Sequence, residues 1–254
     1  MSATANSCRA AILIKAVPRA SKKYGETVCC AGVTEDGTWK RLYPVRFRQL
    51  TDESQFRRWD WVTFRYRRPT DDTRSESCHV FEDTICVEGS VESSRRPEFL
   101  DRLLVGSAKA AAQMNHSLGL IRPRNTRFIF KKKREEAIQA ERELFVKAGR
   151  QASFLDADLE VLEPLPYAFA FRFEDDDGQH TYQCGDWETQ ATFWKWREKY
   201  GDKLALEYLA ARYNDEYPKK GIAFAIGNVL KRPHIWQLLG VIRADATFQT
   251  SLPF

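Results

Sequence analysis

The chain has few of the residues from which zinc sites and disulfide frameworks are built. Its 254 residues include six cysteines and four histidines, and no two cysteines stand in a Cys-x-x-Cys arrangement. Cys29 and Cys30 are adjacent, so in a strand they point to opposite faces. That spacing suits neither a tetrahedral zinc site nor a disulfide framework. It predicts buried free thiols in a reducing compartment.

Motifs of the common enzyme classes are also missing. The sequence has no Walker lysine loop, no Gly-x-Gly-x-x-Gly loop, no Gly-x-Ser-x-Gly elbow and no His-Glu-x-x-His pair. The usual nuclease pattern of an acidic residue followed by Glu-x-Lys is not evident either. The sequence leaves enzymatic activity open, but it favours a protein that has no catalysis of its own and needs no cofactor.

Long apolar runs are absent. The run Ala10–Ile14 is short and is bracketed by Arg9 and Lys15, which is not the pattern of a signal peptide. No segment approaches the length of a membrane span. We therefore expect a cytoplasmic protein with no membrane partner.

Charge is distributed unevenly along the chain. The net charge is +5, yet residues 15–74 carry 14 Lys/Arg against 8 Asp/Glu, and residues 121–150 carry 10 against 4. Residues 151–190 carry 1 against 10. This asymmetry favours an anionic partner for the first 150 residues. The alternative is that the acidic part covers the basic part within the fold.

The N-terminal part reads as a series of short strands. Apolar or alternating patterns predict strands at residues 10–17, 26–33, 38–45, 61–67 and 79–91, with a hairpin turn at Glu35–Gly37 and a short helix at Asp52–Arg58. Several short strands separated by turns indicate a small β-barrel, resembling an OB-fold or a PUA-like barrel. We assign this barrel to residues 1–95.

The rest of the chain predicts helices followed by a second α+β unit. Residues 96–163 form a helical, basic connecting region that includes one strand at 125–130, and Pro164–Pro166 marks the boundary. Residues 164–254 read as an antiparallel ββαββ unit. Its helix begins at Asp186, is divided near Gly201, and carries an apolar stripe along Phe193, Trp196, Tyr200, Leu204 and Tyr208. The predicted fold class is therefore α+β.

Arginines interleave with large aromatic residues between Thr38 and Thr73. Arginine binds phosphate and stacks on flat rings, so this composition suits a nucleic-acid surface. The alternative is a barrel with a solvated basic rim. On the first interpretation, base stacking comes from Trp39, Tyr43 and Trp61. Phosphate contacts come from Arg41, Arg46, Arg48, Arg65, Arg67, Arg68, Lys131, Lys132, Lys133 and Arg134.

A second candidate site lies between Asp175 and Glu188. If the strand continued, His180, Asp186 and Glu188 would project from one face and could hold a divalent metal for catalysis. Asp175 and Asp177 could add metal ligands beside His180. The structural alternative is that Asp186 caps a helix, that Glu188 favours its dipole and that the aspartates form a solvated turn.

Two groups of segments resemble an uncharacterised group of prokaryotic proteins of similar length. The first group is Tyr24–Gly32 with Lys40–Arg48; the second is Cys184–Glu188, Phe224–Asn228 and Trp236–Val241. The resemblance covers both ends of the chain and supplies no catalytic residues. Proteins of this kind look like cargo of mobile or defence-related gene neighbourhoods.

Three functions follow from these features. The leading hypothesis is a nucleic-acid-binding accessory protein that acts with a protein partner, the nucleic acid being DNA or RNA. The second is a metal-dependent nuclease or other hydrolase that uses His180, Asp186 and Glu188. The third is a non-catalytic scaffold subunit whose many aromatic residues form protein contacts.

Overall fold

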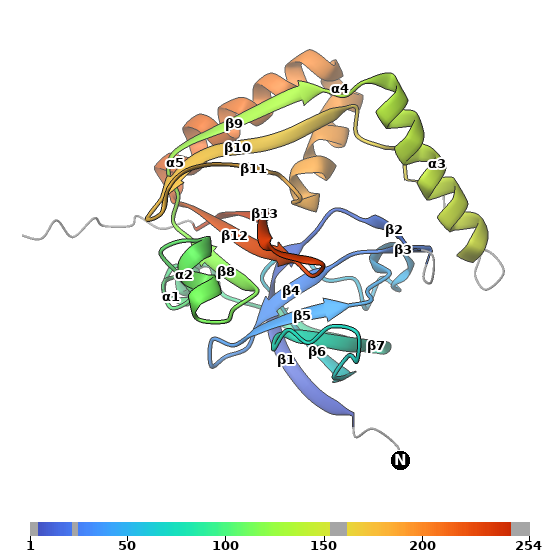
Figure 1. Ribbon diagram of the computed structural model, residues 1–254, viewed down its shortest axis with the longest axis vertical. Coiled ribbons are helices and arrows are strands. Elements are labelled where there is room, and N and C mark those ends of the chain that lie inside the picture. The colour runs from blue at the N-terminus through green and yellow to red at the C-terminus, as the bar shows by residue number, and fades with distance from the viewer. Residues whose placement is uncertain (1–4, 22–24, 153–161, 245–254) are drawn as a thin grey trace, which may run out of the picture.

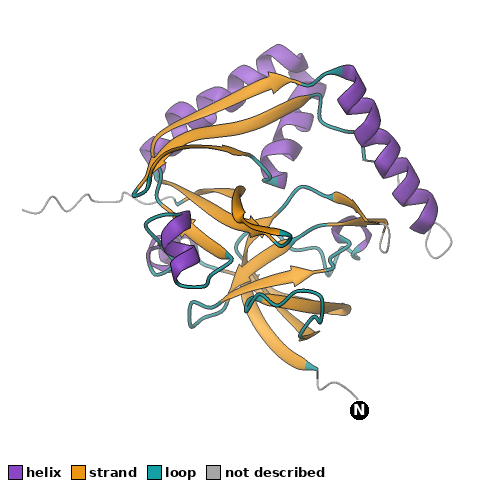
Figure 2. Ribbon diagram, in the orientation of Figure 1, coloured by secondary structure: helices purple, strands orange, loops and turns teal. Residues whose placement is uncertain are grey.

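The computed structural model describes residues 5–21, 25–152 and 162–244 and shows a mixed α+β chain in which strands predominate (Figure 2). Five strands pair in the order β1-β4-β5-β7-β6 and close into a barrel. All pairs are antiparallel except the parallel pair β5–β7. The barrel strands are β1 (Asn6–Lys15), β4 (Cys30–Val33), β5 (Trp39–Tyr43), β6 (Asp60–Arg67) and β7 (Ser77–Ser90).

The strand alternation of β1 divides its residues between two cores. Ala10 and Ile12 belong to a cluster with Leu42 and Phe64 inside the barrel, whereas Ala11 and Leu13 belong to a second cluster on its outer surface. Successive side chains of a strand point to opposite faces, so a strand that is apolar on both faces must be covered twice. This confirms the prediction of a buried strand in this part of the chain.

Two three-stranded sheets lie above the barrel in Figure 1. The central sheet, in the order β13-β12-β8, contains β8 (Leu118–Ile121), β12 (Ile222–Val229) and β13 (Arg232–Arg243). The upper sheet, in the order β11-β10-β9, contains β9 (Arg124–Lys132), β10 (Tyr167–Asp175) and β11 (Gly178–Gln183). A two-stranded hairpin, β2 (Arg19–Ser21) and β3 (Gly25–Thr27), extends beside the barrel.

The central sheet is buried on both faces. In β12, Ala223 and Ala225 belong to the cluster that packs on the barrel, whereas Phe224 and Ile226 belong to the cluster shared with the upper sheet. Phe169, Phe171 and Phe173 of β10 face that second cluster and are almost fully buried. The predicted phenylalanine face of this strand is therefore confirmed.

Helices cover the outside of these layers (Figure 2). The longest, α4, lies behind the upper sheet in Figure 1, while α1 and α2 lie beside β8. The helices are α1 (Arg96–Asp101), α2 (Ala108–Gln113), α3 (Glu135–Ala152), α4 (Trp187–Ala211) and α5 (Tyr217–Lys220), with 3-10 turns η1 (Phe47–Gln49) and η2 (Ser93–Arg95) and a π-helical turn η3 (Arg212–Glu216). No helix among the described residues is long and apolar enough to cross a membrane.

The predicted apolar stripe on α4 is wrong beyond its first two residues. Phe193 is buried and Trp196 is partly buried against the same core cluster, but Tyr200, Leu204 and Tyr208 are each about 40% exposed. Gly201 has φ 77°, which breaks the helix and changes the face that its second half presents. Ala205, Leu206 and Leu209 are the buried residues of that second half.

Two further sequence predictions need correction. The segment Asp52–Arg58 is not a helix: its turns place Phe56 inside the barrel and Arg58 against the C-terminal part. The predicted ββαββ order is present, but its two hairpins lie in different sheets. Each hairpin takes a third strand from residues 118–132, which pairs one edge that would otherwise stay unpaired.

Removing a buried aromatic ring tests how much the core between the two sheets contributes to stability. We expect Phe171→Ala to lower the free energy of unfolding by about 3–5 kcal/mol, because it leaves a cavity among the neighbouring rings of Phe128, Tyr213 and Phe224. Phe130→Ala, at a position 45% exposed on the neighbouring strand, should cost less than about half as much. Urea unfolding of both variants checks this, and equal losses would contradict the assigned core.

Candidate functional site

A cavity of about 380 Å³ lies where the barrel meets the tip of the central sheet. Three arginines from three separate barrel segments line it: Arg19, Arg41 and Arg74. Tyr43, Asn228 and Gln237 also line it, and its described lining contains no aspartate or glutamate. We call it the arginine cavity. Such a lining attracts anions, and planar guanidinium groups match the geometry of phosphate.

Arg41 is the most deeply placed of the three. It lies on β5, is 5% exposed, and donates from one terminal nitrogen to the carbonyl oxygen of Ser117 at 3.0 Å and to its hydroxyl at 3.2 Å. The other terminal nitrogen lies 3.7 Å from the Cys29 sulfur. The Arg41 Nε–H is buried and has no hydrogen-bond partner. A buried donor without an acceptor is costly, so a ligand oxygen at that position would be stabilised.

Ser117 is held between Arg41 and Glu76. Its backbone N–H donates to Glu76 Oε1 at 2.7 Å and its hydroxyl donates to Glu76 Oε2 at 3.1 Å. Burial acts to raise the pKa of Glu76, but the hydrogen bonds from Ser117, from the backbone N–H of Glu76 itself and from the Ser75 hydroxyl together lower the pKa. Glu76 therefore stays ionised and fixes the loop that leads into β8.

Arg74 joins the barrel to β12. One terminal nitrogen donates to the backbone oxygen of Asn228 at 3.2 Å and to its side-chain oxygen at 3.3 Å. Asp72 accepts from Arg74 Nε at 2.8 Å and holds the guanidinium from the other side. Arg19 is exposed at the start of β2. The cavity thus combines two anchored arginines with one that is free to adjust to a ligand.

Glycine allows the close packing at this seam. A Cβ atom added to Gly227 would lie 2.6 Å from Leu239 Cδ1 and 3.4 Å from a terminal nitrogen of Arg41. A Cβ atom on Gly185 would lie 3.2 Å from the backbone oxygen of Leu238. A side chain at position 227 would therefore collide with Leu239 and with Leu118, 2.9 Å away, while Arg41 would stay at contact distance.

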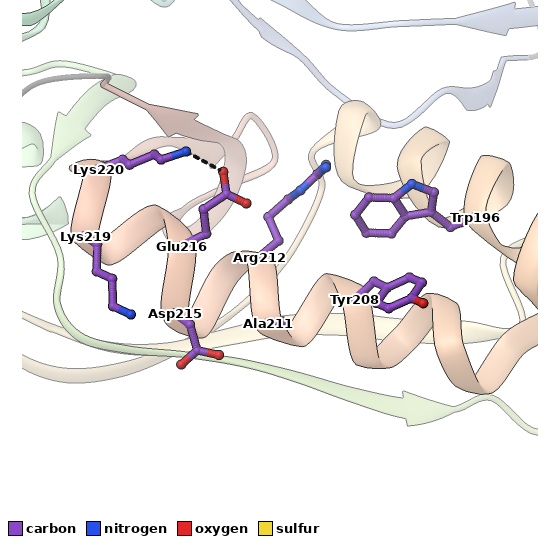
Figure 3. Close-up of a pocket in the computed structure, with 8 residues that line it drawn as sticks. All are labelled: Trp196, Tyr208, Ala211, Arg212, Asp215, Glu216, Lys219 and Lys220. Carbon is purple, nitrogen blue, oxygen red and sulfur yellow. Dashed lines mark hydrogen bonds and ion pairs between the residues drawn. The ribbon is translucent and has the colours of Figure 1, made fainter.

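Two other cavities open on the surface. One of about 420 Å³ adjoins the arginine cavity and is lined by α3, β10 and the segment before α4. The other, of about 560 Å³, lies beside the second half of α4. Figure 3 shows Trp196 next to Tyr208, with Arg212 directed toward the indole and Glu216 joined to Lys220.

The predicted stacking platform does not form as a single surface. Trp39, Arg41 and Tyr43 do share one face of β5, but β6 carries Trp61 and is separated from β5 by β7 on one side and by β4 and β1 on the other. The pairing series Trp39–Val33–Ala11–Trp61 spans three strand spacings, roughly 14 Å. Trp39 is 7% exposed and belongs to the core cluster that includes Phe99 and Leu100 of α1. Trp61 is partly buried against the same cluster, contacts Phe99 edge-on and has the Arg9 guanidinium 4.4 Å over its ring.

The predicted phosphate-binding residues are spread over the surface. Arg41 and Tyr43 line the arginine cavity, and Lys133 lines the adjoining cavity. Arg46 pairs with Glu82 at 2.8 Å. The remainder line neither of these cavities: Arg48, Arg65, Arg67, Arg68, Lys131, Lys132 and Arg134. Arg19 and Arg74 were missed; Arg19 stands in a basic loop, but only the fold brings the two beside Arg41.

Asp186 is engaged by an arginine. Its Oδ1 accepts from Arg58 at 2.8 Å, and both side chains are less than 10% exposed. Its Oδ2 accepts from the Thr189 hydroxyl at 2.9 Å. Burial raises the pKa of Asp186, and the Arg58 guanidinium opposes that shift. Asp186 does precede the first residue of α4, as predicted, but its side chain makes no hydrogen bond to the helix backbone.

His180 and Glu188 do not join Asp186 in a metal site. The strand β11 ends at Gln183, so the shared face does not continue to residue 188. Glu188 lies 3.5 Å from Arg58 and 3.8 Å from Lys15, while His180 Nε2 lies 2.8 Å from Asp175 Oδ1. Asp177 pairs with Lys109 at 3.3 Å. Among residues 5–21, 25–152 and 162–244, no group of three or more His, Cys, Asp or Glu side chains is placed to hold a metal ion.

Two family models cover the chain. Residues 6–102 match a domain of unknown function (DUF8758), and residues 102–253 match a second domain of unknown function (DUF8757). The chain belongs to the DUF8757 family. The expectation of a family without an established function is thereby confirmed, and the barrel of this member corresponds to the DUF8758 domain. None of the curated proteins matches the chain.

Substitution of Asp186 distinguishes an ion pair from a helix cap. Asparagine caps a helix about as well as aspartate, so a capping role predicts little change in Asp186→Asn. The ion pair predicts a loss of up to about 3–5 kcal/mol in unfolding free energy, because buried Arg58 loses its buried counter-charge and keeps only the 3.5 Å contact with the partly exposed Glu188. The control is Asp202→Asn, at a partly exposed pair with Arg197 that should cost below about 1 kcal/mol. Chemical denaturation measures both; a neutral Asp186→Asn would restore the cap interpretation.

The stability of the Ser117 loop should depend on pH through Glu76. Because the folded pKa of Glu76 is below its ordinary value of 4.5, its carboxylate stabilises the fold at neutral pH and loses this effect as the pH falls through the folded pKa. At pH 7 the free energy of unfolding of the wild type should exceed that of Glu76→Gln by about 1–3 kcal/mol. The difference should shrink below pH 4.5. Urea unfolding from pH 3 to 7 tests this, with exposed Glu53→Gln as control; a pH-independent difference would be the contrary result.

Proposed function

We propose that this chain is a nucleic-acid-binding accessory protein that holds its ligand in the arginine cavity. The observation that carries the proposal is the convergence of Arg19, Arg41 and Arg74 on one cavity whose described lining has no acidic side chain. Phosphate is the ligand group that such a set of guanidinium donors suits best.

The place of the cavity in the barrel supports the same proposal. We assign the barrel to the OB-like class, since it is a closed five-stranded barrel with one parallel pair. OB-folds bind oligonucleotides on their second and third strands and on the loops after the first and fourth strands. The corresponding elements here are β4, β5, residues 16–29 and residues 68–76, and each except β4 contributes to the cavity lining.

The proposal is one of binding rather than catalysis. A metal-dependent hydrolase needs carboxylate or histidine ligands near the scissile phosphate. The described residues that line the arginine cavity include neither. Asp186, the central residue of the alternative metal site, forms an ion pair with Arg58.

A protein partner remains part of the proposal. Tyr200, Leu204 and Tyr208 on the second half of α4 are each about 40% exposed, and Trp196 lies beside them. Exposed large apolar residues that are grouped on one helix are typical of protein contacts. The association with mobile or defence-related genes remains a prediction from the sequence.

The cavity arginines should determine nucleic-acid affinity. We expect Arg19→Ala/Arg74→Ala to weaken binding at least tenfold and to reduce the slope of log K against log salt by about 1–2, because up to two phosphate contacts are lost. The matched control is Arg65→Ala/Arg67→Ala, which removes the same charge from the barrel outside this cavity and should leave the affinity within about threefold. Fluorescence anisotropy with labelled single- and double-stranded DNA and RNA measures both. Equal weakening by the two folded variants would refute the cavity as the site.

A further inference from the structure

The second cavity shares a wall with the arginine cavity. Val17, Arg19, Ala20, Gly185 and Gln237 line both. The second cavity has a volume of about 420 Å³ and continues to Lys133 and α3. A ligand in the arginine cavity that is longer than one nucleotide therefore has a neighbouring cavity of similar size into which it can extend.

The shared wall is fixed by backbone hydrogen bonds. The Val17 N–H donates to the Gly185 carbonyl at 2.8 Å, and the Gly185 N–H donates to the Leu238 carbonyl at 2.7 Å. The three segments come from the end of β1, the connection before α4, and β13. The spacing between the two cavities is thus set by main-chain contacts between the barrel and the central sheet.

The two cavities differ in chemistry. The arginine cavity presents guanidinium groups, whereas the second has three amides, one partly buried tyrosine, two buried phenylalanines and an ion pair: Gln183, Gln190, Gln237, Tyr167, Phe145, Phe169, and Lys133 with Glu141. Amide side chains both donate and accept hydrogen bonds, and the Tyr167 ring offers a stacking surface, which together suit an unpaired base. Lys133 lies 2.7 Å from Glu141, which holds its ammonium group in place within this cavity.

We propose that the two cavities bind consecutive nucleotides of a single-stranded nucleic acid, with a phosphate in the arginine cavity and an adjacent base in the second cavity. This rests on the proposed function and narrows its ligand to a single strand of at least two nucleotides. In a duplex, the hydrogen-bonding edge of a base is paired with the opposite strand and its two faces stack on the neighbouring bases. Such a base cannot enter a side cavity unless it is first extruded from the duplex. The arginine cavity, at about 380 Å³, is assigned a whole nucleotide, so the base in the second cavity is that of the next nucleotide, which a free mononucleotide lacks.

A ligand series on the full chain tests the proposal. The probes are thymidine 5′-monophosphate, the dinucleotide with a 5′-phosphate, a thymidylate hexamer and a twelve-base-pair duplex, each measured by competition against a labelled hexamer at low salt. We expect the hexamer and the dinucleotide to bind at least tenfold more tightly than the mononucleotide, and the duplex to bind more weakly than the hexamer. Equal affinity for mononucleotide and hexamer, or preference for the duplex, would overturn the proposal while leaving the arginine cavity as a phosphate site.

Neighbouring lysines provide the matched variants. Lys133→Ala should weaken hexamer binding about tenfold and leave mononucleotide binding unchanged, because Lys133 lines only the second cavity. Lys132→Ala removes the same charge from an exposed position outside both cavities and should change neither. Gln183→Ala, at an exposed position on β11, gives a second variant in the same cavity and should also spare mononucleotide binding.

The outcomes separate the two proposals. Equal effects of Lys132→Ala and Lys133→Ala on hexamer binding would show that general charge, and not the second cavity, determines it. If no probe binds at low salt, the proposed function itself fails. If every probe binds and only Arg19→Ala/Arg74→Ala weakens binding, the proposed function stands and the two-cavity proposal fails.

Discussion

The ion pair between Arg58 and Asp186 holds the barrel against the rest of the chain. Arg58 belongs to the barrel and donates to Asp186 at 2.8 Å and to the backbone oxygen of Val241 on β13. Both charged groups are almost fully buried, so hydrogen bonds to their remaining polar atoms decide whether the pair is stable; the Arg58 Nε–H lacks such a bond, whereas both Asp186 oxygens accept one. Thr189 accordingly binds the second oxygen of Asp186 and also contacts the Tyr213 hydroxyl at 2.8 Å.

This pair sets the geometry of the candidate site. Asp186 follows directly after Gly185, whose backbone bonds to Val17 and Leu238 form the wall between the two cavities. Arg41 and Arg74 cross the same seam to Ser117 and Asn228. The basic residues at this seam therefore have two roles. Some hold the C-terminal part in place, and others, such as Arg19, line a cavity. Arg41 and Arg74 have both roles, which preorganises them for an anion.

Local patterns predicted most of the secondary structure. The alternation in β6 and β10, the turn at Gly37 with φ 86°, and the break of α4 at Gly201 were all evident in the sequence, because each depends on a few neighbouring residues. The assignment of strands to sheets was not evident. The recruitment of β8 and β9 by separate hairpins is a matter of long-range pairing, and the apolar residues of β12 do not reveal which layers cover them.

The sequence indicated which types of residue form the site, but it located only some of them. Arginine among aromatic residues indicated Arg41 and Tyr43, which do line the cavity, but it also indicated Trp39 and Trp61, which lie in or against the core cluster that includes Phe99 of α1. A tryptophan in a strand gives no local sign of whether solvent or a helix covers it. Asp186 was expected as a cap or a metal ligand because its partner Arg58 lies 128 residues away and nothing local connects them.

Photo-crosslinking of the wild-type chain to a single-stranded oligonucleotide containing 5-bromouracil, followed by peptide mapping, tests the central claim most directly. The account predicts crosslinks in the segments that line the two cavities, at residues 16–20, Tyr43 and Tyr167. Crosslinks confined to the Arg65–Arg68 side of the barrel would contradict it, because they would place the nucleic acid on a surface that the arginine cavity does not share.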